Sequence, residues 1–269
     1  MLRRAAWLVG SIALGPAFDP TVFAQEPGLR APFVTTPDEV VAEMLALAGT
    51  SREDYVVDLG SGDGRIVIAA AQRFGAHALG VDLDEKLVAL SRDLARKAGV
   101  AERTEFRVQD ALKTDLSRAS VVTIYLLPQL INELQPRVLD SMQPGARVVT
   151  HAFYMQSWRP DAVRKVRLTQ HHAGQGDEST IYLWIVPAKA RGEWRAGDWR
   201  LRIQQNFQVI EVEGEAAGRP LAVHGAKLEG ASIEFHGEGF AFRGRVSRDY
   251  IAGEMARSGA LLPMTFSRR

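Results

Sequence analysis

The chain has 269 residues, enough for one or two domains, and its 46% apolar content is ordinary for a globular protein. Its formal net charge of +1 provides no large basic field, which argues against nucleic acid as a partner. Because it contains no cysteine, disulfides, thiolate metal sites and a cysteine nucleophile are excluded. The six histidines show no metal-ligand spacing, so we expect no metal site.

The N-terminus has the pattern of an export signal. A basic pair at residues 3–4 precedes an apolar run over residues 5–15, and a small-residue cleavage site ends at Ala24. The apolar run is too short to span a bilayer, which needs about 20 residues. We therefore predict a signal peptide over residues 1–24 and a periplasmic or secreted protein. The alternative is an uncleaved leader that brings the chain into contact with a membrane.

A helix is predicted to follow a linker that covers residues 25–35. Thr36 is expected to be its N-cap, with Pro37 at the first helical position and Glu39 at the third, which together form a capping box. Apolar side chains then recur on one face of the helix up to Leu47.

The next segment has the pattern of a strand, a glycine-rich turn and a helix. An apolar strand over 55–59 runs into three glycines at alternate positions, Gly60, Gly62 and Gly64, and an alanine-rich helical stretch follows over 65–74. This pattern is typical of the opening of a nucleotide-binding βαβ unit. The glycines let the backbone turn tightly and approach a ligand closely.

The spacing of these glycines and the charge around them indicate the kind of ligand. The loop lacks the G-x-G-x-x-G spacing of NAD-binding proteins, and two carboxylates, Asp58 and Asp63, lie in or beside it. Carboxylates repel a diphosphate, but they suit a ligand with a positive charge, an amino group and no phosphate. S-adenosylmethionine (SAM) is such a ligand. We therefore expect SAM as the cofactor and disfavour an NAD-dependent oxidoreductase.

Two further acids end the next two predicted strands. Asp82 ends the first of them and is expected to bind the ribose hydroxyls, with Leu83 against the base. Asp110 ends the second, and its carboxylate is placed to accept from the adenine amino group. Helix capping or a solvated turn is the alternative for each acid alone, but three such acids beside one glycine loop favour a ligand. The candidate cofactor residues are Asp58, Gly60, Ser61, Gly62, Asp63, Gly64, Asp82, Leu83, Asp110, Ala111 and Tyr125.

Strands and helices continue to alternate after the loop. The predicted elements cover residues 78–82, 85–98, 106–110, 121–127, 128–142, 146–153, 166–171 and 180–186. A glycine-containing connection joins the last two, so an antiparallel hairpin is expected. The pattern predicts an α/β domain over residues 36–189, with a Rossmann-like seven-stranded sheet and helices on both faces.

The pattern changes after a boundary near residues 187–192. Apolar and polar residues alternate with period two from Trp199 onward, and glycines separate the short strand candidates. We predict a small antiparallel β barrel or sandwich over residues 193–269. Its aromatic residues are expected to form its core, and a role in binding the protein substrate or a partner is a hypothesis. These aromatic residues are Trp194, Trp199, Phe207, Phe235, Phe240 and Phe242.

The glycine loop with Asp82 resembles the signature of class I SAM-dependent methyltransferases. Residues 32–37, 58–71 and 121–128 together resemble the protein N-lysine methyltransferases whose mitochondrial members modify the adenine nucleotide translocase and the c-ring protein of ATP synthase. This resemblance covers about residues 32–155 and implies an enzyme that methylates a lysine of a protein. Two alternatives remain open: a small-molecule methyltransferase on the same fold, and an exported SAM- or nucleoside-binding protein without turnover.

The resemblance also implies where in the fold the methyl transfer takes place. In this fold the carboxyl ends of the fourth and fifth strands face the methyl group, and here those ends hold Tyr125 and His151. Tyr125 is a candidate to orient a lysine amine, and His151, with an ordinary pKa near neutrality, is a candidate to accept its proton. Packing between sheet and helix is the alternative for both. Thr36 and Pro37 become candidates for the cofactor or substrate entrance, with plain capping as the alternative.

The segment at residues 125–128 indicates which chemical class of methyl acceptor the enzyme uses. It reads Tyr-Leu-Leu-Pro, whereas enzymes that methylate adenine or glutamine amides carry Asn/Asp-Pro-Pro-Tyr/Phe there. This difference between the two motifs argues against a planar amine as the acceptor and favours an aliphatic amine in an apolar channel. Because SAM is made in the cytosol, a cytoplasmic or membrane-tethered location is the alternative to export.

Overall fold

The computed structural model describes residues 33–169 and 176–269, and Phe33–Arg269 forms one compact unit. The predicted signal peptide and residues 25–32 of the predicted linker lie outside the described residues. Within the described ranges, no helix has the length and apolar character needed to cross a bilayer.

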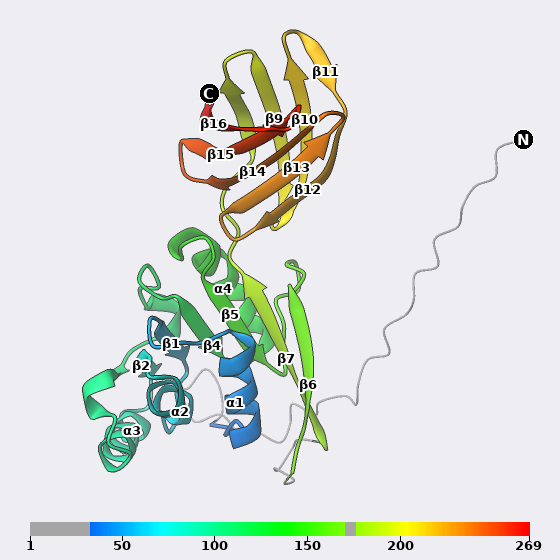
Figure 1. Cartoon of the computed structure of the whole chain (residues 1–269). Helices are drawn as coiled ribbons and strands as arrows, with labels where there is room; N and C mark the ends of the chain where they lie inside the picture. The colour runs from blue at the N-terminus through cyan, green and yellow to red at the C-terminus, as the bar shows by residue number, and fades with distance from the viewer. Residues whose placement is uncertain (1–32, 170–175) are drawn as a thin grey trace, which may run out of the picture. The chain divides into compact units, whose positions relative to one another are not determined.

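A seven-stranded sheet forms the first part of the unit (Figure 1), with the strand order β3-β2-β1-β4-β5-β7-β6. Strands β1 to β5 run parallel, while β7 is antiparallel to both of its neighbours, β5 and β6. The bounds are β1 Tyr55–Leu59, β2 His77–Asp82, β3 Thr104–Val108, β4 Val121–Ile124, β5 Arg147–His151, β6 Ala162–Arg167 and β7 Glu178–Ile185. The predicted Rossmann-like sheet with its terminal hairpin is confirmed.

Helices cover both faces of this sheet because the central strands are apolar on both sides. The residues of β1, β4 and β5 are almost all buried. Side chains of α1, α2 and α3 build the core on one face, and side chains of α4 build the core on the other. The helices are α1 Asp38–Leu47, α2 Arg65–Phe74, α3 Glu85–Lys97 and α4 Pro128–Ser141. The carboxyl ends of the parallel strands therefore lie at one edge, where ligands bind in such sheets.

Several predicted boundaries are wrong by a few residues. Helix α1 begins one residue later than expected, its N-cap is Pro37, and no side chain caps it. The predicted capping box does not form, because Thr36 faces His151 and Glu39 accepts a hydrogen bond from the backbone N–H of Thr169. Strand β6 begins at Ala162, four residues before the predicted start at residue 166. Contacts between residues that are distant in the sequence decide where these elements begin. Local sequence patterns carry no information about such contacts.

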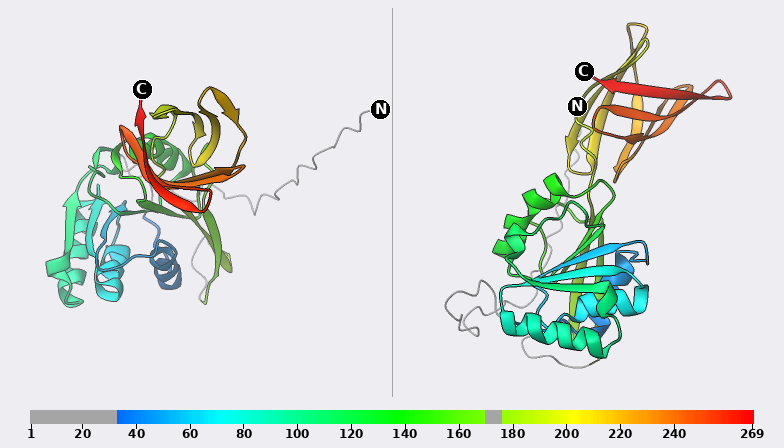
Figure 2. Two further views of the ribbon diagram at one scale, coloured as in Figure 1. Left: turned by 45° about the horizontal axis from the view of Figure 1, so that its top comes forward. Right: turned by 90° about the vertical axis from the view of Figure 1, so that its left-hand side faces the viewer.

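A nine-stranded antiparallel sheet forms the second part, with the order β11-β10-β9-β8-β16-β15-β14-β13-β12. It curls strongly (Figure 2), and β10 comes close to β12, so the sheet is a nearly closed barrel. The bounds are β8 Gly192–Ala196, β9 Trp199–Asn206, β10 Val209–Ala216, β11 Arg219–Leu221, β12 Val223–Glu229, β13 Ser232–Gly237, β14 Phe240–Val246, β15 Tyr250–Arg257 and β16 Ala260–Arg268. The predicted antiparallel β domain is confirmed.

The core of the barrel follows from alternation along its strands. Buried and exposed residues alternate in β9 and β14, as expected for strands with one face on a core. Five of the six predicted core aromatics are buried there: Trp194, Trp199, Phe235, Phe240 and Phe242. The prediction is wrong for Phe207, which packs against the α4-side core of the first sheet.

Candidate functional site

The loop between β1 and α2 depends on its three glycines. Gly60, Gly62 and Gly64 have positive φ values of 81°, 52° and 79°. A Cβ atom at Gly60 would lie 2.7 Å from Leu126 Cδ2, one at Gly62 would lie 2.6 Å from Phe33 Cε2, and one at Gly64 would lie 2.7 Å from a ring carbon of Phe106. The loop is therefore enclosed by three different segments, and only glycine fits both its backbone and its surroundings.

The backbone N–H groups of the loop are used within the protein. Gly60 and Ser61 both donate to Val81 O at 2.9 Å, and Gly64 donates to Ser61 O at 2.8 Å. The N–H of Gly62 donates to the Asp82 carboxylate at 2.8 Å. A loop that binds a diphosphate needs N–H groups that point at the ligand. This loop directs four of them elsewhere, which agrees with a ligand that carries no phosphate.

Asp58 occupies a buried position at the end of β1. It is 2% exposed and accepts a hydrogen bond from Thr123 Oγ1 at 2.7 Å. Burial raises the pKa of Asp58 to about 7, the hydrogen bond from Thr123 opposes that rise, and the negative charges of Asp82 and Asp63 add to it. A positive group beside this carboxyl would favour its ionised form. The site is therefore suited to a cation.

Asp63 has a different environment from the one we expected. Its carboxylate pairs with the Arg65 guanidinium, with Oδ2 at 2.6 Å from Nη2. The same guanidinium donates to Thr36 O at 2.8 Å. Arg65 thus offsets the charge of Asp63 and joins the glycine loop to the segment that precedes α1. The charge of Asp63 is therefore used in an ion pair within the protein, and Arg65 holds the segment before α1 in place.

The other predicted cofactor residues lie at the ends of β2 and β3. Asp82 Oδ2 accepts from Gly62 N, and Asp82 Oδ1 accepts from Asp84 N at 3.0 Å. Leu83 follows with 38% of its surface exposed. Asp110 Oδ1 accepts from Leu112 N at 2.9 Å and caps the short 3-10 helix Ala111–Lys113. Capping thus accounts for one oxygen of Asp110, and the three acids do lie at one edge of the sheet, as the sequence predicts.

Tyr125 and His151 lie together at the ends of β4 and β5. Their ring centroids are 4.1 Å apart. His151 is fully buried, with Nδ1 3.4 Å from Thr36 Oγ1 and Nε2 3.0 Å from Ser179 Oγ. Burial lowers the pKa of His151 to about 4, so the expected value near neutrality is wrong. His151 is neutral at physiological pH, and its contacts suit it to holding Tyr125 and Thr36 in place rather than to accepting a proton.

The backbone turns sharply just after His151. Ala152 has a φ of 63°, and Phe153 N donates to His151 O at 2.7 Å, which closes a three-residue turn. Ala152 N donates to Thr180 O at 2.8 Å, and the Thr150 hydroxyl donates to Phe153 O. A turn of this kind with a non-glycine centre is strained, and such strain persists only where the surroundings fix it.

Sequence reasoning missed several residues of this site. Thr123 and Ser179 are partners of Asp58 and His151 across neighbouring strands, and only the register of the sheet brings them together. Arg65 directly follows the glycine loop, so its closeness to Asp63 was a usable signal. Ala152 gave no signal, because positive φ is expected at glycine or asparagine.

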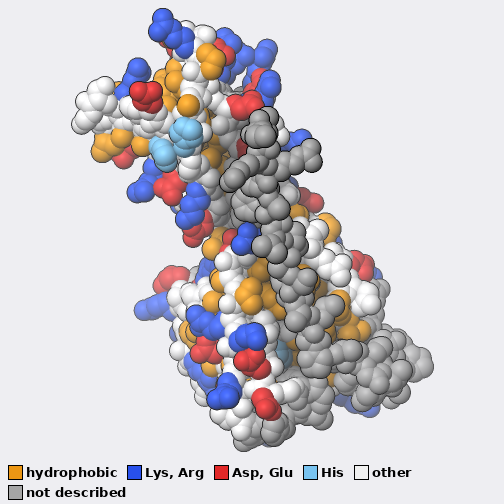
Figure 3. Space-filling model, turned by 90° about the vertical axis from the view of Figure 1, so that its right-hand side faces the viewer, with side chains coloured by type: hydrophobic (Ala, Val, Ile, Leu, Met, Phe, Trp, Pro, Cys, Tyr) orange, Lys and Arg blue, Asp and Glu red, His pale blue; other side chains and the backbone are white. Residues whose placement is uncertain are grey.

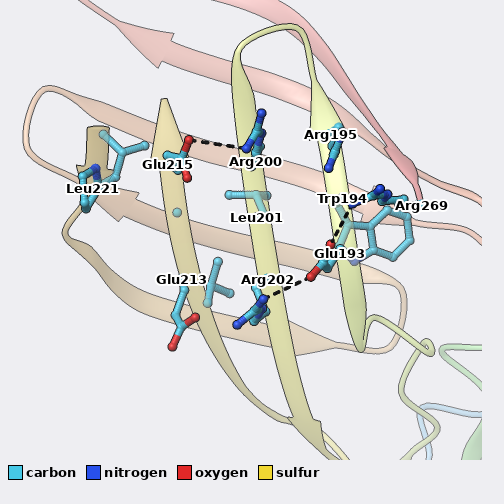
Figure 4. Close-up of a pocket in the computed structure, with 13 residues that line it drawn as sticks. Glu193, Trp194, Arg195, Arg200, Leu201, Arg202, Glu213, Glu215, Leu221 and Arg269 are labelled. Atoms are coloured by element: carbon cyan, nitrogen blue, oxygen red, sulfur yellow. Dashed lines mark hydrogen bonds and ion pairs between the residues drawn. The ribbon is translucent and has the colours of Figure 1, made fainter. Parts of the chain in front are cut away.

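A hollow with a volume of about 660 Å³ lies on the β domain, lined mainly by residues of strands β8, β9 and β10 (Figure 4). Arginines and glutamates line it in opposed pairs. Arg202 Nη2 lies 3.1 Å from Glu193 Oε1, and Arg200 Nη1 lies 3.8 Å from Glu215 Oε1. These ion pairs offset part of the charge that lines the hollow.

Comparison with known proteins points to one family. A family model described as ANTKMT methyltransferase domain matches residues 58–162. The chain is 36% identical over 157 residues to a protein-lysine N-methyltransferase of Saccharolobus islandicus (strain REY15A), and the match covers 58% of this chain and 93% of the relative. It is 36% identical over 135 residues to the adenine nucleotide translocase lysine N-methyltransferase of Mus musculus, and the match covers 50% of this chain and 58% of the relative.

A solved structure shows a similar fold. It is an RNA methyltransferase from Salinibacter ruber in complex with S-adenosyl-L-homocysteine (SAH). The sequence identity is 44% and the TM-score is 0.52, and the match covers 58% of this chain and 95% of that chain. The bound SAH agrees with the cofactor predicted from the glycine loop and its acids.

Proposed function

This chain belongs to the family of class I SAM-dependent methyltransferases that contains these lysine N-methyltransferases, and from this premise we propose that it methylates a lysine amine of a protein. One observation carries the proposal. The apolar segment at residues 125–128 follows β4 and packs on the cofactor loop, where Leu126 fills the space beside Gly60. An apolar segment beside the cofactor loop suits an aliphatic amine better than a planar one.

The residues of the loop fit SAM. Asp58 offers a buried carboxyl for the cationic part of the cofactor, and Asp82 lies where the ribose hydroxyls are bound in such sheets. The N–H groups of Gly60, Ser61, Gly62 and Gly64 make internal hydrogen bonds, and the carboxylates beside the loop repel a diphosphate. When bound, SAM supplies a methyl group on a positively charged sulfur. The protein then has to place the amine in line with that methyl group, which is mainly a matter of orientation.

The acceptor amine must lose a proton before it can react, because the pKa of a free lysine is about 10.4. Leu126 beside the cofactor loop offers apolar surface, and apolar surroundings lower the pKa of an amine by desolvation. The Tyr125 ring, fixed by His151, offers an electron-rich face that attracts the amine while it is still charged. The pKa of His151, about 4, makes it a weak base, so in this account the proton leaves to water.

Methylation of RNA is the second candidate, because the relative from Salinibacter ruber carries that description. Two observations favour lysine. Residues 125–128 lack the residues that bind a planar base amine, and the formal net charge of the whole chain is only +1. On the face in Figure 3, cationic and anionic side chains are interspersed rather than gathered in a basic stripe. Binding of a nucleic acid backbone usually depends on such a stripe.

Tritium transfer tests the proposal directly. The full chain is incubated with methyl-tritiated SAM and whole-cell extract, and label is counted separately in protein, RNA and small molecules. We expect label in protein that yields methyl-lysine after acid hydrolysis, and none with the Asp58→Asn variant. Label in the RNA fraction, or in small molecules alone, would reject the lysine assignment. Binding of SAM without any labelled product would instead support a binding protein.

A further inference from the structure

The turn between β9 and β10 belongs to the β domain but contacts the domain that contains the seven-stranded sheet, which we call the first domain. Phe207 lies at this turn with a φ of 53°. Its ring stacks on Trp158, with centroids 5.6 Å apart and an interplanar angle of 15°. Gln205 Nε2 donates to Phe207 O at 2.7 Å and to Ala188 O at 2.8 Å, so the turn is fixed in this conformation.

Gln208, the next residue, uses its whole amide group on the same part of the first domain. Its Oε1 accepts from Trp158 Nε1 at 2.8 Å. Its Nε2 donates to Arg159 O at 2.8 Å and to Asp161 Oδ1 at 3.3 Å. Trp158 is fully buried, and its carbonyl accepts from Trp184 Nε1 at 2.8 Å. Without Gln208, the indole N–H of Trp158 would lose its partner in a buried place.

The segment held by Gln208 is the one that begins at the strained turn beside Tyr125 and His151. Residues 152–161 start with the positive φ of Ala152. In the middle of the segment, helix α4 holds it: Gln156 N donates to Asn132 Oδ1, and Ser157 bonds with Gln135. Two parts of the protein hold the far end of the segment. Strand β7 holds Asp161, whose Oδ2 accepts from Ile185 N at 2.7 Å, and the β9–β10 turn holds Trp158 and Arg159 through Gln208.

We propose that Gln208 and Phe207 are positioning residues for the acceptor side of the methyl-transfer site. Strain of the kind seen at Ala152 persists only where the surroundings fix the backbone. The far end of the segment is fixed by β7, where Asp161 N donates to Leu183 O at 2.8 Å, and by the β domain through Gln208. Phe153 and Tyr154 directly follow the turn at Ala152, so we expect their placement to respond to how the segment is held. This inference rests on the proposed function, because it assigns the β domain a part in the same reaction.

The test compares Gln208→Ala with Gln204→Ala in the full chain. Gln204 lies on β9, close to the β9–β10 turn that carries Gln208, and it is exposed, so it is a matched control. In Gln208→Ala, amide hydrogen exchange in residues 152–161 is expected to speed up about tenfold, the size expected when a buried donor loses its partner. Exchange in residues 56–64 and the affinity for SAH are expected to stay within about twofold of the control, because the cofactor loop does not depend on the segment. Transfer of label to extract protein is expected to fall about tenfold, as orientation is lost.

A double-mutant cycle with Trp158→Phe tests whether Gln208 acts through its hydrogen bond to Trp158 or only through the overall stability of the protein. Removing the indole N–H takes away the donor that Gln208 satisfies, so Gln208→Ala is expected to change exchange less in that background. Equal exchange in Gln208→Ala and Gln204→Ala would overturn the inference, as would equal losses of SAH affinity and label transfer. If the wild-type chain labels no protein, the proposed function fails, while the exchange comparison still decides whether Gln208 holds the segment.

Discussion

The Thr123 hydroxyl donates to the buried Asp58 carboxyl at 2.7 Å, across the neighbouring parallel strands β4 and β1. This bond is the main influence that opposes the rise in the Asp58 pKa caused by burial. With a pKa of about 7, Asp58 changes its charge in the physiological range. The affinity of the cofactor site for a cation is therefore coupled to pH.

We expect SAM affinity to rise with pH up to about 7 and then to level off. Below the Asp58 pKa of about 7, binding of the cation must release a proton, which lowers affinity by up to about tenfold for each pH unit. Calorimetry between pH 5.5 and 8.5 measures this slope. Asp58→Asn is the control, and it should bind weakly with no slope. An equal slope in both proteins would show that another group is responsible.

The unliganded chain should show the opposite trend in stability. The pKa of Asp58 rises from 3.8 to about 7 on folding, so its contribution to folding is fully present below pH 3.8 and is lost as pH rises through about 7. Urea unfolding between pH 5 and 8, with Asp58→Asn as the reference, measures the difference. A contribution that grew with pH would contradict the assignment of this pKa.

Replacing Thr123 by valine should move the SAM titration to higher pH. The variant loses the hydroxyl that stabilises the Asp58 carboxylate, so the pKa rises further. Thr123→Ser keeps the hydroxyl and serves as the matched control. The midpoint of the calorimetric pH profile reports the shift, and identical midpoints in the two variants would count against the role of this bond.

A methyl group at Gly62 should weaken SAM binding by at least about tenfold. Its Cβ would lie 2.6 Å from the Phe33 ring, and a positive φ already disfavours alanine by about 1–2 kcal/mol. Gly49→Ala is the control, because Gly49 also has a positive φ but has open space around it. Adding Phe33→Ala to Gly62→Ala should restore part of the affinity in calorimetry. No recovery would show that Phe33 is not the obstacle.

His151→Asn should reduce turnover without changing its pH profile. A histidine with a pKa of about 4 does not titrate between pH 6 and 8, and removal of a general base typically costs about 10²–10⁴ in rate. We expect a loss of about tenfold or less, because the change disturbs Tyr125 and Thr36. Initial rates of label transfer from pH 6 to 9 check this. Loss of an inflection near pH 6.5 in the variant would restore His151 as the base.

The fold and the cofactor edge were predictable because their signals are local. Three alternate glycines allow only a narrow set of turns, and an acid at the end of an apolar strand lies at the ligand edge of a parallel sheet. The order of strands and helices then follows from hydrophobic periodicity. These features require no knowledge of which strands pair.

The remaining features of the site depend on contacts between distant parts of the chain. Thr36 looked like a helix cap, but His151, 115 residues away, engages its hydroxyl. His151 looked like a base with an ordinary pKa, but burial lowers that pKa. Phe207 looked like barrel core, but it stacks on Trp158 of the other sheet. In each case the sequence gives the chemistry of the residue but not its surroundings.

Calorimetry of the full chain with SAM, SAH and NAD at pH 7.5 tests the central claim most directly. With the loop N–H groups used internally and Asp58 buried at the mouth of β1, we predict that SAM and SAH bind and that NAD produces no heat. Saturable binding of NAD, with no heat from SAM, would contradict the account.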